Sequence, residues 1–284
     1  MSDNVARYPL PRARRAAASF AAGWNRIGDQ TAFYVKSIAS TRDAVLYYKG
    51  EIARLIASMS LGVGALAVIG GTVVIIILLT GSVGGLVAIQ GYTSLGSIGV
   101  EALTGFFSAY VQVRFSTPAI AAIGLAVTVG AGATAQLGAM RINEEIDALE
   151  VMAVRAIAYV VSTRLIAGVI VVIPLFCMAT ITATAFTRFL VIFVYGQSSG
   201  VYDHYFNTFL QPFDIFASFL EAVVMGLVIM LVHTYYGFNA SGGPAGVGEA
   251  VGRAVRASLV AAVSVALVIA LATYGESGNF HLSG

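Results

Sequence analysis

Long apolar stretches, separated by short polar segments, recur along most of this chain. One of them reads LGVGALAVIGGTVVIIILL and contains no charged residue. A helix needs about 20 consecutive apolar residues to cross the hydrocarbon core of a bilayer. Only 11% of the 284 residues are charged and the mean hydropathy is +0.86, so a soluble fold would lack surface charge. The sequence therefore predicts an all-α polytopic membrane protein.

We expect about five transmembrane helices, over residues 52–79, 99–137, 156–186, 215–236 and 257–274. The second is too long for one straight crossing, and Pro118 inside it removes a backbone donor. Hydropathy leaves two forms open for this span, a single kinked helix or a re-entrant piece followed by a helix. Gly81 and Gly85 have a spacing that allows neighbouring helices to approach closely.

Residues 1–50 form a separate region that is basic and amphipathic. Apolar or small side chains recur there at a spacing of three to four, at Phe20, Trp24, Ile27, Thr31 and Tyr34. This pattern is typical of a helix lying in the membrane interface. The basic cluster at residues 11–15 superficially suggests nucleic-acid binding, but beside so much membrane sequence a membrane anchor is the better interpretation. No apolar region before residue 50 resembles a cleavable signal.

The basic residues indicate the orientation of the chain. With five crossings and the N-terminus inside, the cytosolic segments are residues 1–54, about 140–164 and about 239–256. They hold fourteen of the sixteen lysines and arginines, all except Arg114 and Arg188. Because positive charge favours the cytosolic side, we expect the N-terminus in the cytosol and the C-terminus outside.

A dense acidic segment joins the second and third expected spans. Four of the fourteen carboxylates lie within seven residues, at Glu144, Glu145, Asp147 and Glu150. An apolar face repeats through the same segment, at Ile142, Ile146, Leu149 and Ala153. The pattern predicts an amphipathic helix over residues 143–151 with Asn143 as its N-cap. On spacing alone, a solvated linker and a docking helix for a soluble partner remain equally open.

Motifs for catalysis and nucleotide binding are missing from the sequence. Neither Lys36 nor Lys49 follows a glycine, so there is no Gly-Lys-Ser/Thr phosphate-binding loop. His233 is the only histidine within an expected span, and the sequence shows no convincing serine or aspartate partner for it. Cys177 is the only cysteine, which excludes a disulfide framework. We therefore expect no catalytic residue, no metal site and no cofactor on this chain.

Residues 127–154, VTVGAGATAQLGAMRINEEIDALEVMAV, resemble the signature of MlaE-type permeases, called YrbE in the Mce (mammalian cell entry) systems. Family members show a similar Gly-rich helix end, then LG-x-MR and E-x-IDALE-x-M. The resemblance continues at Gln90-Gly-Tyr92, at residues 162–174 and at residues 237–253, and it covers roughly residues 50–275.

This resemblance implies the permease subunit of an ABC transporter for lipids in the bacterial inner membrane. Such permeases have an interfacial helix and five spans, and they work as a dimer on two ATPase subunits, beneath Mce proteins that carry hydrophobic cargo. The acidic helix would then be the coupling helix seated in the ATPase. Its contact residues would be Asn143, Glu144, Glu145, Ile146, Asp147, Leu149 and Glu150. ATP and Mg²⁺ would bind to the ATPase.

One motif departs from the family pattern. Many members carry Arg-Glu-Leu-x-Pro, whereas this chain has Phe115-Ser-Thr-Pro118, which keeps the proline and loses the charged pair. The YrbE variant without that pair resembles the B-type subunit, which pairs with an A-type chain. We therefore expect a heterodimer with an A-type YrbE permease.

The resemblance also implies a lipid path near the outer leaflet. Gln90 and Tyr92 match the family segment that forms part of the lipid cavity, and Leu86 and Ile89 would supply apolar contacts. Glu101 and Arg114 could line the same path, because charges at membrane depth usually face a cavity or a partner. Positions in an ordinary interfacial belt are the alternative for these residues.

Two other functional classes remain open. A secondary transporter or channel would need neither an ATPase nor a coupling helix, although no internal repeat is visible in the sequence. A scaffold subunit would assemble Mce proteins without forming a lipid cavity of its own.

Overall fold

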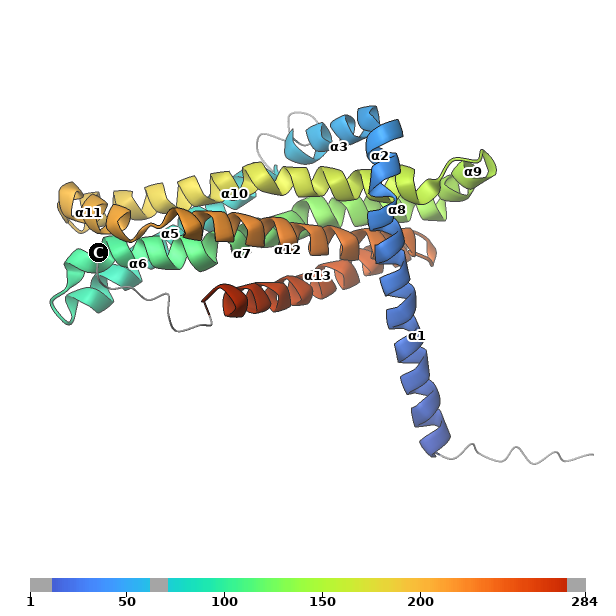
Figure 1. Cartoon of the computed structure of the whole chain (residues 1–284), viewed down its shortest axis with the longest axis horizontal. Coiled ribbons are helices and arrows are strands. Elements are labelled where there is room, and N and C mark those ends of the chain that lie inside the picture. Colours follow the sequence, from blue (N-terminus) through green and yellow to red (C-terminus); the bar gives the residue numbers. More distant parts are fainter. Residues whose placement is uncertain (1–11, 62–70, 275–284) are drawn as a thin grey trace, which may run out of the picture.

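The computed structural model describes residues 12–61 and 71–274, which form helices without any β-strand. Five helical runs are long and apolar enough to cross a membrane: Thr72–Gly96, Glu101–Ile142, Ile157–Val194, Pro212–Phe238 and Gly243–Thr273. They lie alongside one another as a bundle, with α9 (Glu145–Val151) at one end and α11 (Ser199–Phe209) at the other (Figure 1). We call these the α9 end and the α11 end. The predicted all-α polytopic fold is confirmed.

The first span lies further along the chain than residues 52–79. Residues 49–61 form a separate helix, α3 (Lys49–Leu61), and the span itself is α5 (Thr72–Gly96). Residues 62–70, which belong to the expected span, lie outside the described residues. Hydropathy placed the end of the span too early because Gly, Ser, Thr and Gln dilute the second half of α5. Several of these residues, including Thr80, Gly84 and Gly91, are buried against other helices.

The second span is one continuous helical run, which excludes a re-entrant piece followed by a separate helix. Its turns change type along the run: η1 (Glu101–Leu103), α6 (Thr104–Ser108), η2 (Ala109–Ser116), α7 (Thr117–Gly124), η3 (Leu125–Gly130) and α8 (Ala131–Ile142). The segments η2 and η3 are π-helical. Pro118 stands in the first turn of α7, directly after η2, so its missing donor falls where the hydrogen-bond ladder changes spacing.

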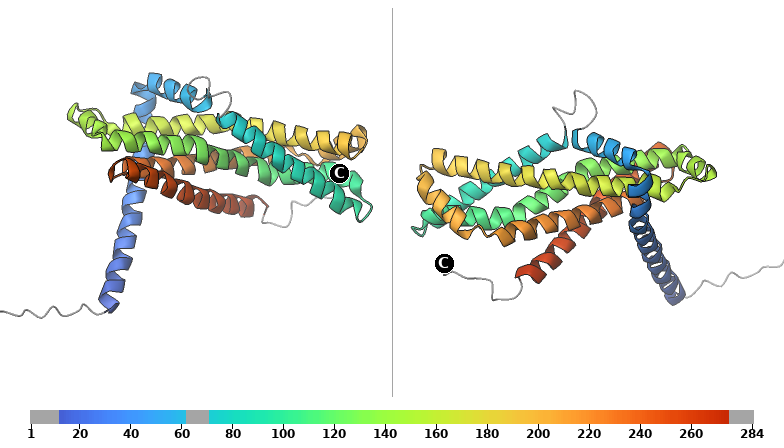
Figure 2. Two further views of the ribbon diagram at one scale, coloured as in Figure 1. Left: turned by 180° about the vertical axis from the view of Figure 1, so that it is seen from behind. Right: turned by 45° about the horizontal axis from the view of Figure 1, so that its top comes forward.

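The remaining spans are longer than hydropathy predicts. The third comprises η4 (Ile157–Ser162), α10 (Thr163–Phe189) and η5 (Leu190–Val194), the fourth is α12 (Pro212–Phe238), and the fifth is α13 (Gly243–Tyr274). The helix α13 begins well before residue 257 because its first turns are polar and extend past the apolar part. Figure 2 shows α13 diverging from the bundle toward its C-terminal end. An apolar stripe is exposed along it, at Val260, Val263, Leu267, Val268 and Leu271.

The main core lies between the spans and is built from small and aliphatic side chains. Its fully buried members include Ile76, Leu125, Met225 and Ile229. Close approach between α5 and α10 depends on Gly84, because a Cβ there would lie 2.7 Å from the carbonyl oxygen of Ala183. The space around Gly81 is open, and a Cβ at Gly85 would lie at an ordinary distance of 3.4 Å from the ring of Phe186. The tight contact is therefore made by Gly84 and not by the predicted pair Gly81 and Gly85.

The N-terminal helix α1 (Arg12–Ala39) crosses the bundle near its α9 end and projects well beyond it (Figure 1). Its C-terminal half packs on the bundle through Phe33, whose ring lies 5.4 Å from Tyr235 and 5.5 Å from Phe238 between centroids. Tyr34 is half-buried beside it, and burial raises the pKa of its phenol to about 12. The short helix α2 (Thr41–Tyr47) follows and leads into α3.

Candidate functional site

The helix α9 joins the second and third spans at the tip of the bundle (Figure 1). Its apolar side is anchored, since Ile146 is fully buried and Leu149 is half-buried. Its carboxylates, Glu145, Asp147 and Glu150, are exposed, as is Glu144 just before it. An amphipathic helix with an anchored apolar face and an exposed acidic face is therefore present at the predicted place.

The start of this helix differs from the prediction. Asn143 does not cap it but ends α8, and no side-chain capping bond is present at either position. Glu144 stands immediately before α9 in the left-handed region, with φ of 59°. A left-handed residue lets the chain reverse between α8 and α9 in two residues, so backbone geometry replaces the expected cap.

The end of α9 is also closed by a left-handed residue. Ala153 has φ of 58°, and its amide donates to the carbonyl of Glu150 at 3.0 Å while the amide of Val154 donates to that of Leu149 at 3.0 Å. This pair of bonds is the Schellman arrangement, which usually has glycine at the left-handed position. Ala153 is thus exposed beyond the helix end and is not part of the apolar face predicted for it.

The acidic residues do not all have the same surroundings. Arg141 donates to the carboxylate of Asp147 at 2.5 Å, which ties α9 back to α8. Among the described residues, Glu144, Glu145 and Glu150 have no ion-pair partner. Two apolar side chains beside them are strongly exposed, Val151 at 88% and Met152 at 65%. We call these five residues, Glu144, Glu145, Glu150, Val151 and Met152, the α9 surface.

The residues predicted for a lipid path lie toward the α11 end and fall into two groups. Leu86, Ile89 and Gln90 are exposed on one side of α5. Tyr92 points back into the chain, where its ring stacks on that of Tyr195 with centroids 4.5 Å apart. The first three residues therefore form an outward-facing stripe, whereas Tyr92 packs within the subunit.

Glu101 and Arg114 are not brought together. Arg114 donates to the carboxylate of Asp214 at 2.8 Å and lies over the ring of Tyr110, 4.5 Å from its centroid. The side chains of this ion pair are only 12% and 5% exposed. Arg114 stands four residues before Pro118, as the arginine of Arg-Glu-Leu-x-Pro does. The prediction that the charged pair of this motif is lost is therefore wrong for the arginine and holds for the glutamate.

At the α11 end, α11 is held against α6 and α10. The hydroxyl of Tyr202 donates to Ser108 at 2.9 Å, and burial raises the pKa of this tyrosine to about 12. Arg188 donates two hydrogen bonds of 2.8 Å to Asp203, which lowers the pKa of that carboxyl. Gly105 allows the contact, because a Cβ there would lie 2.4 Å from the carbonyl oxygen of Tyr202.

His233 has partners that the sequence did not reveal. Its Nδ1 lies 2.8 Å from the hydroxyl of Thr134 on α8, and its Nε2 lies 3.1 Å from that of Ser258 on α13. The ring is fully buried, and all three groups join spans that are far apart in sequence. A sealed ring with both nitrogens engaged is a packing junction, since a catalytic base needs access to substrate.

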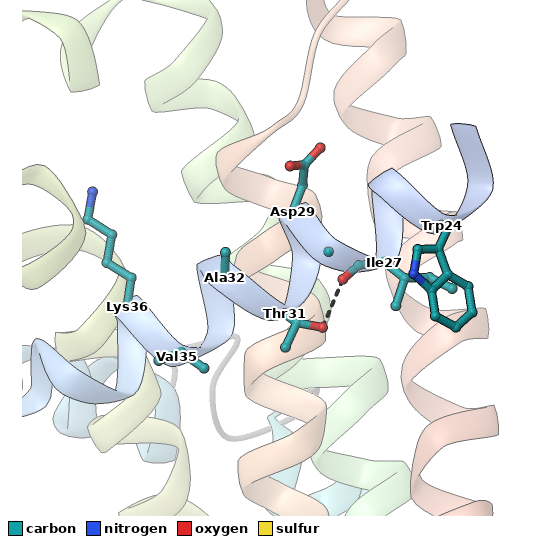
Figure 3. Close-up of a pocket in the computed structure, with 8 residues that line it drawn as sticks. Trp24, Ile27, Asp29, Thr31, Ala32, Val35 and Lys36 are labelled. Carbon is teal, nitrogen blue, oxygen red and sulfur yellow. Dashed lines mark hydrogen bonds between the residues drawn. The ribbon is translucent and has the colours of Figure 1, made fainter. Parts of the chain in front are cut away.

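Part of α1 presents apolar side chains away from the bundle. Figure 3 shows Trp24, Ile27 and Val35 along one side of the helix, whereas Asp29 and Lys36 point to the other side. Trp24 is 69% exposed and Val35 is 62% exposed. Of the residues predicted for the apolar face of this helix, Trp24, Ile27 and Thr31 are exposed, whereas Tyr34 packs on the bundle. The side chain of Phe20 lies outside the described residues. Within residues 12–61 and 71–274, no three His, Cys, Asp or Glu side chains are grouped as metal ligands.

Comparison with known proteins gives a consistent result. A probable ABC transporter permease protein of Rickettsia felis is 26% identical over 260 residues, which are 88% of this chain and 94% of that protein. One from Rickettsia bellii is 26% identical over 191 residues, 67% of this chain and 71% of that protein. The Arabidopsis thaliana protein TRIGALACTOSYLDIACYLGLYCEROL 1, chloroplastic, is 30% identical over 163 residues, 57% of this chain and 47% of its own length.

The family model described as Permease MlaE matches residues 63–272. The match includes the first four spans, α9, the predicted lipid-path residues and the fifth span up to residue 272. Since it covers most of the 284 residues, this chain belongs to the MlaE permease family.

Proposed function

We propose that this chain is the permease subunit of an ABC-type lipid transporter, in which a separate ATPase drives the movement of lipid or fatty-acid-like cargo across the cell envelope. The α9 surface carries this proposal. It presents three carboxylates that have no ion-pair partner among residues 12–61 and 71–274, and two exposed apolar side chains at the tip of the bundle. A basic groove with an apolar floor on the ATPase would complement it.

The orientation follows from charge. Arg141 and Arg155 flank α9 in the sequence, and Arg253 and Arg256 lie in the first half of α13. This helix starts at the α9 end, near which the basic helix α1 also lies (Figure 1). By the positive-inside rule, this charge supports a cytosolic α9 end in a bacterium, with the α11 end outside the inner membrane. On this placement the C-terminus is outside, and the exposed apolar side of α1 lies in the inner leaflet.

Force on α9 would reach the lipid path through the two spans that it joins. The runs Glu101–Ile142 and Ile157–Val194 extend from α9 across the bundle toward the α11 end. The permease itself needs no catalytic group, cofactor or metal, because ATP and Mg²⁺ bind to the ATPase. Its proposed role is to convert motion of α9 into a rearrangement of the lipid path in the outer half of the spans.

The exposed stripe of Leu86, Ile89 and Gln90 is the best candidate for lipid contact. Tyr92 and Arg114 would support that region from within the subunit, through Tyr195 and Asp214. Glu101 is exposed beyond the end of α5 and would stand at the mouth of the path. The name of the Arabidopsis relative, which is that of a galactolipid, supports a lipid cargo.

The same resemblance gives the proposed partners. An A-type YrbE permease would complete the dimer, two ATPases would bind the α9 ends, and Mce proteins would sit on the α11 end. Retention of Arg114 weakens the sequence argument for a B-type chain, so the heterodimer rests on the missing glutamate alone. A stable homodimer of this chain that stimulates the ATPase would contradict the heterodimer.

The proposal is tested by reversing charge on the α9 surface. Glu145→Lys with Glu150→Lys should abolish co-purification of the ATPase, because two attractive contacts become repulsive. Glu249→Lys is the matched control, since this carboxylate is also exposed near the α9 end but lies on α13. Unchanged ATPase binding and lipid uptake in the double variant would instead favour a secondary transporter or a scaffold.

A further inference from the structure

The segment that follows α9 is attached to the N-terminal helices. Arg155, at the start of the third span, donates a hydrogen bond to the carboxylate of Asp43 on α2. The two residues are 112 positions apart, so the contact is tertiary. Arg155 stands directly after the loop that closes α9. This ion pair therefore attaches the chain to α2 only four residues after the end of α9.

Two further contacts continue this attachment into the span. The hydroxyl of Ser162 donates to the carbonyl of Ser37 on α1 at 2.8 Å, and both serines are fully buried. The rings of Tyr48 and Tyr159 meet edge to face with centroids 5.0 Å apart. Together, the pairs Asp43–Arg155, Ser37–Ser162 and Tyr48–Tyr159 form what we call the elbow clamp.

The three contacts of the elbow clamp do not contribute equally to stability. The side chain of Arg155 is 73% exposed, and an exposed ion pair contributes little to stability. A buried hydrogen bond costs more to break, because the groups left behind lose their solvation. The Ser37–Ser162 bond therefore fixes the position of α1 on the bundle, while the Asp43–Arg155 pair extends the attachment to the α9 loop.

Directly beside the clamp, α1 and the α9 loop are separated by a pocket of about 330 Å³. Lys36 of α1 and Ser40, which precedes α2, line it on one side. Glu150, Ala153 and Val154 line it from the α9 side. No ion pair joins Lys36 to Glu150 among the described residues. The clamp therefore joins α1 and α2 to the start of the third span, directly after α9. In addition, Phe33 of α1 and Leu149 of α9 pack against the same hydrophobic cluster.

We propose that the elbow clamp makes α1 and α2 move together with α9, so that the ATPase displaces the crosswise helix as well as the second and third spans. This inference rests on the proposed function, because it requires the ATPase to act on α9. Asp43 and Arg155 are positioning residues in it. They contact neither cargo nor nucleotide and act through the helices that they join.

The length of α1 makes such a motion consequential. Its 28 residues extend about 42 Å at 1.5 Å per residue, and much of this length projects beyond the bundle. Rotation at the clamped end therefore displaces the projecting end by a larger distance. The side chains that move are those of the exposed apolar side, including Trp24 and Ile27 (Figure 3). Each ATPase stroke would thus disturb the lipids around α1.

The test measures distances in the complete complex with its ATPase, in a Cys177→Ala background. Spin labels at Ala32 and Ala148 report the separation of α1 from α9, and labels at Ala148 and Ala245 report that of α9 from α13. All three positions are exposed and lie outside the α9 surface. On trapping the ATPase with ATP and vanadate, we expect the α9–α13 distance to shift and the α1–α9 distance to stay constant.

Charge variants identify the clamp as the cause. Arg155→Asp and Asp43→Arg should each make the α1–α9 distance shift on trapping, and the double variant should restore its constancy. Arg253→Asp is the matched control, because it breaks an exposed ion pair on α13. A shift of the α1–α9 distance in the unmodified complex as large as that of α9–α13 would overturn the clamp. So would single variants that behave like the unmodified protein.

Failure of the proposed function gives a different result. In that case the ATPase does not co-purify, or neither distance responds to trapping, and the clamp has no stroke to transmit. A complex in which the α9–α13 distance responds but the charge variants have no effect overturns only the clamp. The two proposals are therefore distinguished by the same set of labelled samples.

Discussion

Replacing Ala153 by glycine should stabilise α9, which is the reverse of the usual effect of glycine in a helical segment. Ala153 closes the helix with φ of 58° and is exposed, so the change removes a methyl group with little packing. A left-handed conformation costs a residue with a Cβ about 1–2 kcal/mol. Glycine loses about 0.5–1 kcal/mol more conformational entropy on ordering. The net gain is therefore about 0.5–1 kcal/mol.

The matched control is Ala148→Gly, five residues earlier and inside α9. Ala148 is also exposed, but it lies within α9, and its carbonyl accepts the amide of Met152 at 3.1 Å. Glycine in a helix interior costs about 1 kcal/mol relative to alanine. The two Ala→Gly changes have the same effect on the unfolded segment, so their difference of about 1.5–2 kcal/mol isolates the backbone conformation at residue 153.

Amide hydrogen exchange measures this difference, because it reports the local opening of short elements such as α9 as well as global unfolding. Protection of the α9 amides should rise by roughly two- to fivefold in Ala153→Gly and fall by about fivefold in Ala148→Gly. The amide of Val154, which bonds to Leu149, is the most informative probe. Loss of protection in both variants would refute the left-handed closure of α9.

Three further predictions concern the bundle. Gly84→Ala should lower the free energy of unfolding by about 1–3 kcal/mol, measured by thermal denaturation, because its Cβ would lie 2.7 Å from a backbone oxygen. Gly81→Ala is the control and should not lower it, because the space around Gly81 is open. Equal effects of the two substitutions would contradict this packing. Asp214→Asn should cost about 3–5 kcal/mol, because the charge of Arg114 stays buried, and replacing both residues by Leu and Met should cost less. The ion pair between Arg188 and Asp203, which helps to hold α11, should weaken in acid. Because the pKa of Asp203 is lowered in the folded protein, its stabilising contribution is complete above pH 3.8, the ordinary pKa. That contribution is lost as the pH falls through the lowered pKa. A spin label on α11 should become more mobile at low pH, and in Asp203→Asn its mobility should no longer change with pH in this range.

For α9, the local sequence pattern predicts the buried face correctly but not the way in which the helix begins. The spacing of Ile146 and Leu149 correctly predicts the buried side of α9, because the helical period alone decides which residues share a face. The prediction for Asn143 is wrong because capping competes with the geometry of the reversal after α8. That reversal places Glu144 in a left-handed conformation, which glutamate rarely adopts and which no sequence pattern indicates.

The number of spans follows from hydropathy, whereas the ends of the first span do not. Hydropathy measures transfer to lipid, but the second half of α5 is stabilised by neighbouring helices that bury polar residues such as Thr80. The ion pair of Arg114 with Asp214 is equally hidden from a local pattern, since 100 residues separate the two. Such contacts depend on which helices become neighbours, and that is a property of the whole bundle.

The two π-helical stretches of the second span bear on how the family can vary in length. A π turn contains about one residue more than an α turn, and each added residue rotates the remainder of the helix by about 100°. Deleting a residue from η2 would restore α-helical pitch there. The two ends of the span would then rotate against each other, so that with α9 in place Arg114 would no longer face Asp214. Insertions and deletions in this span should therefore be tolerated only in compensating pairs, because the residue count sets which way each end faces.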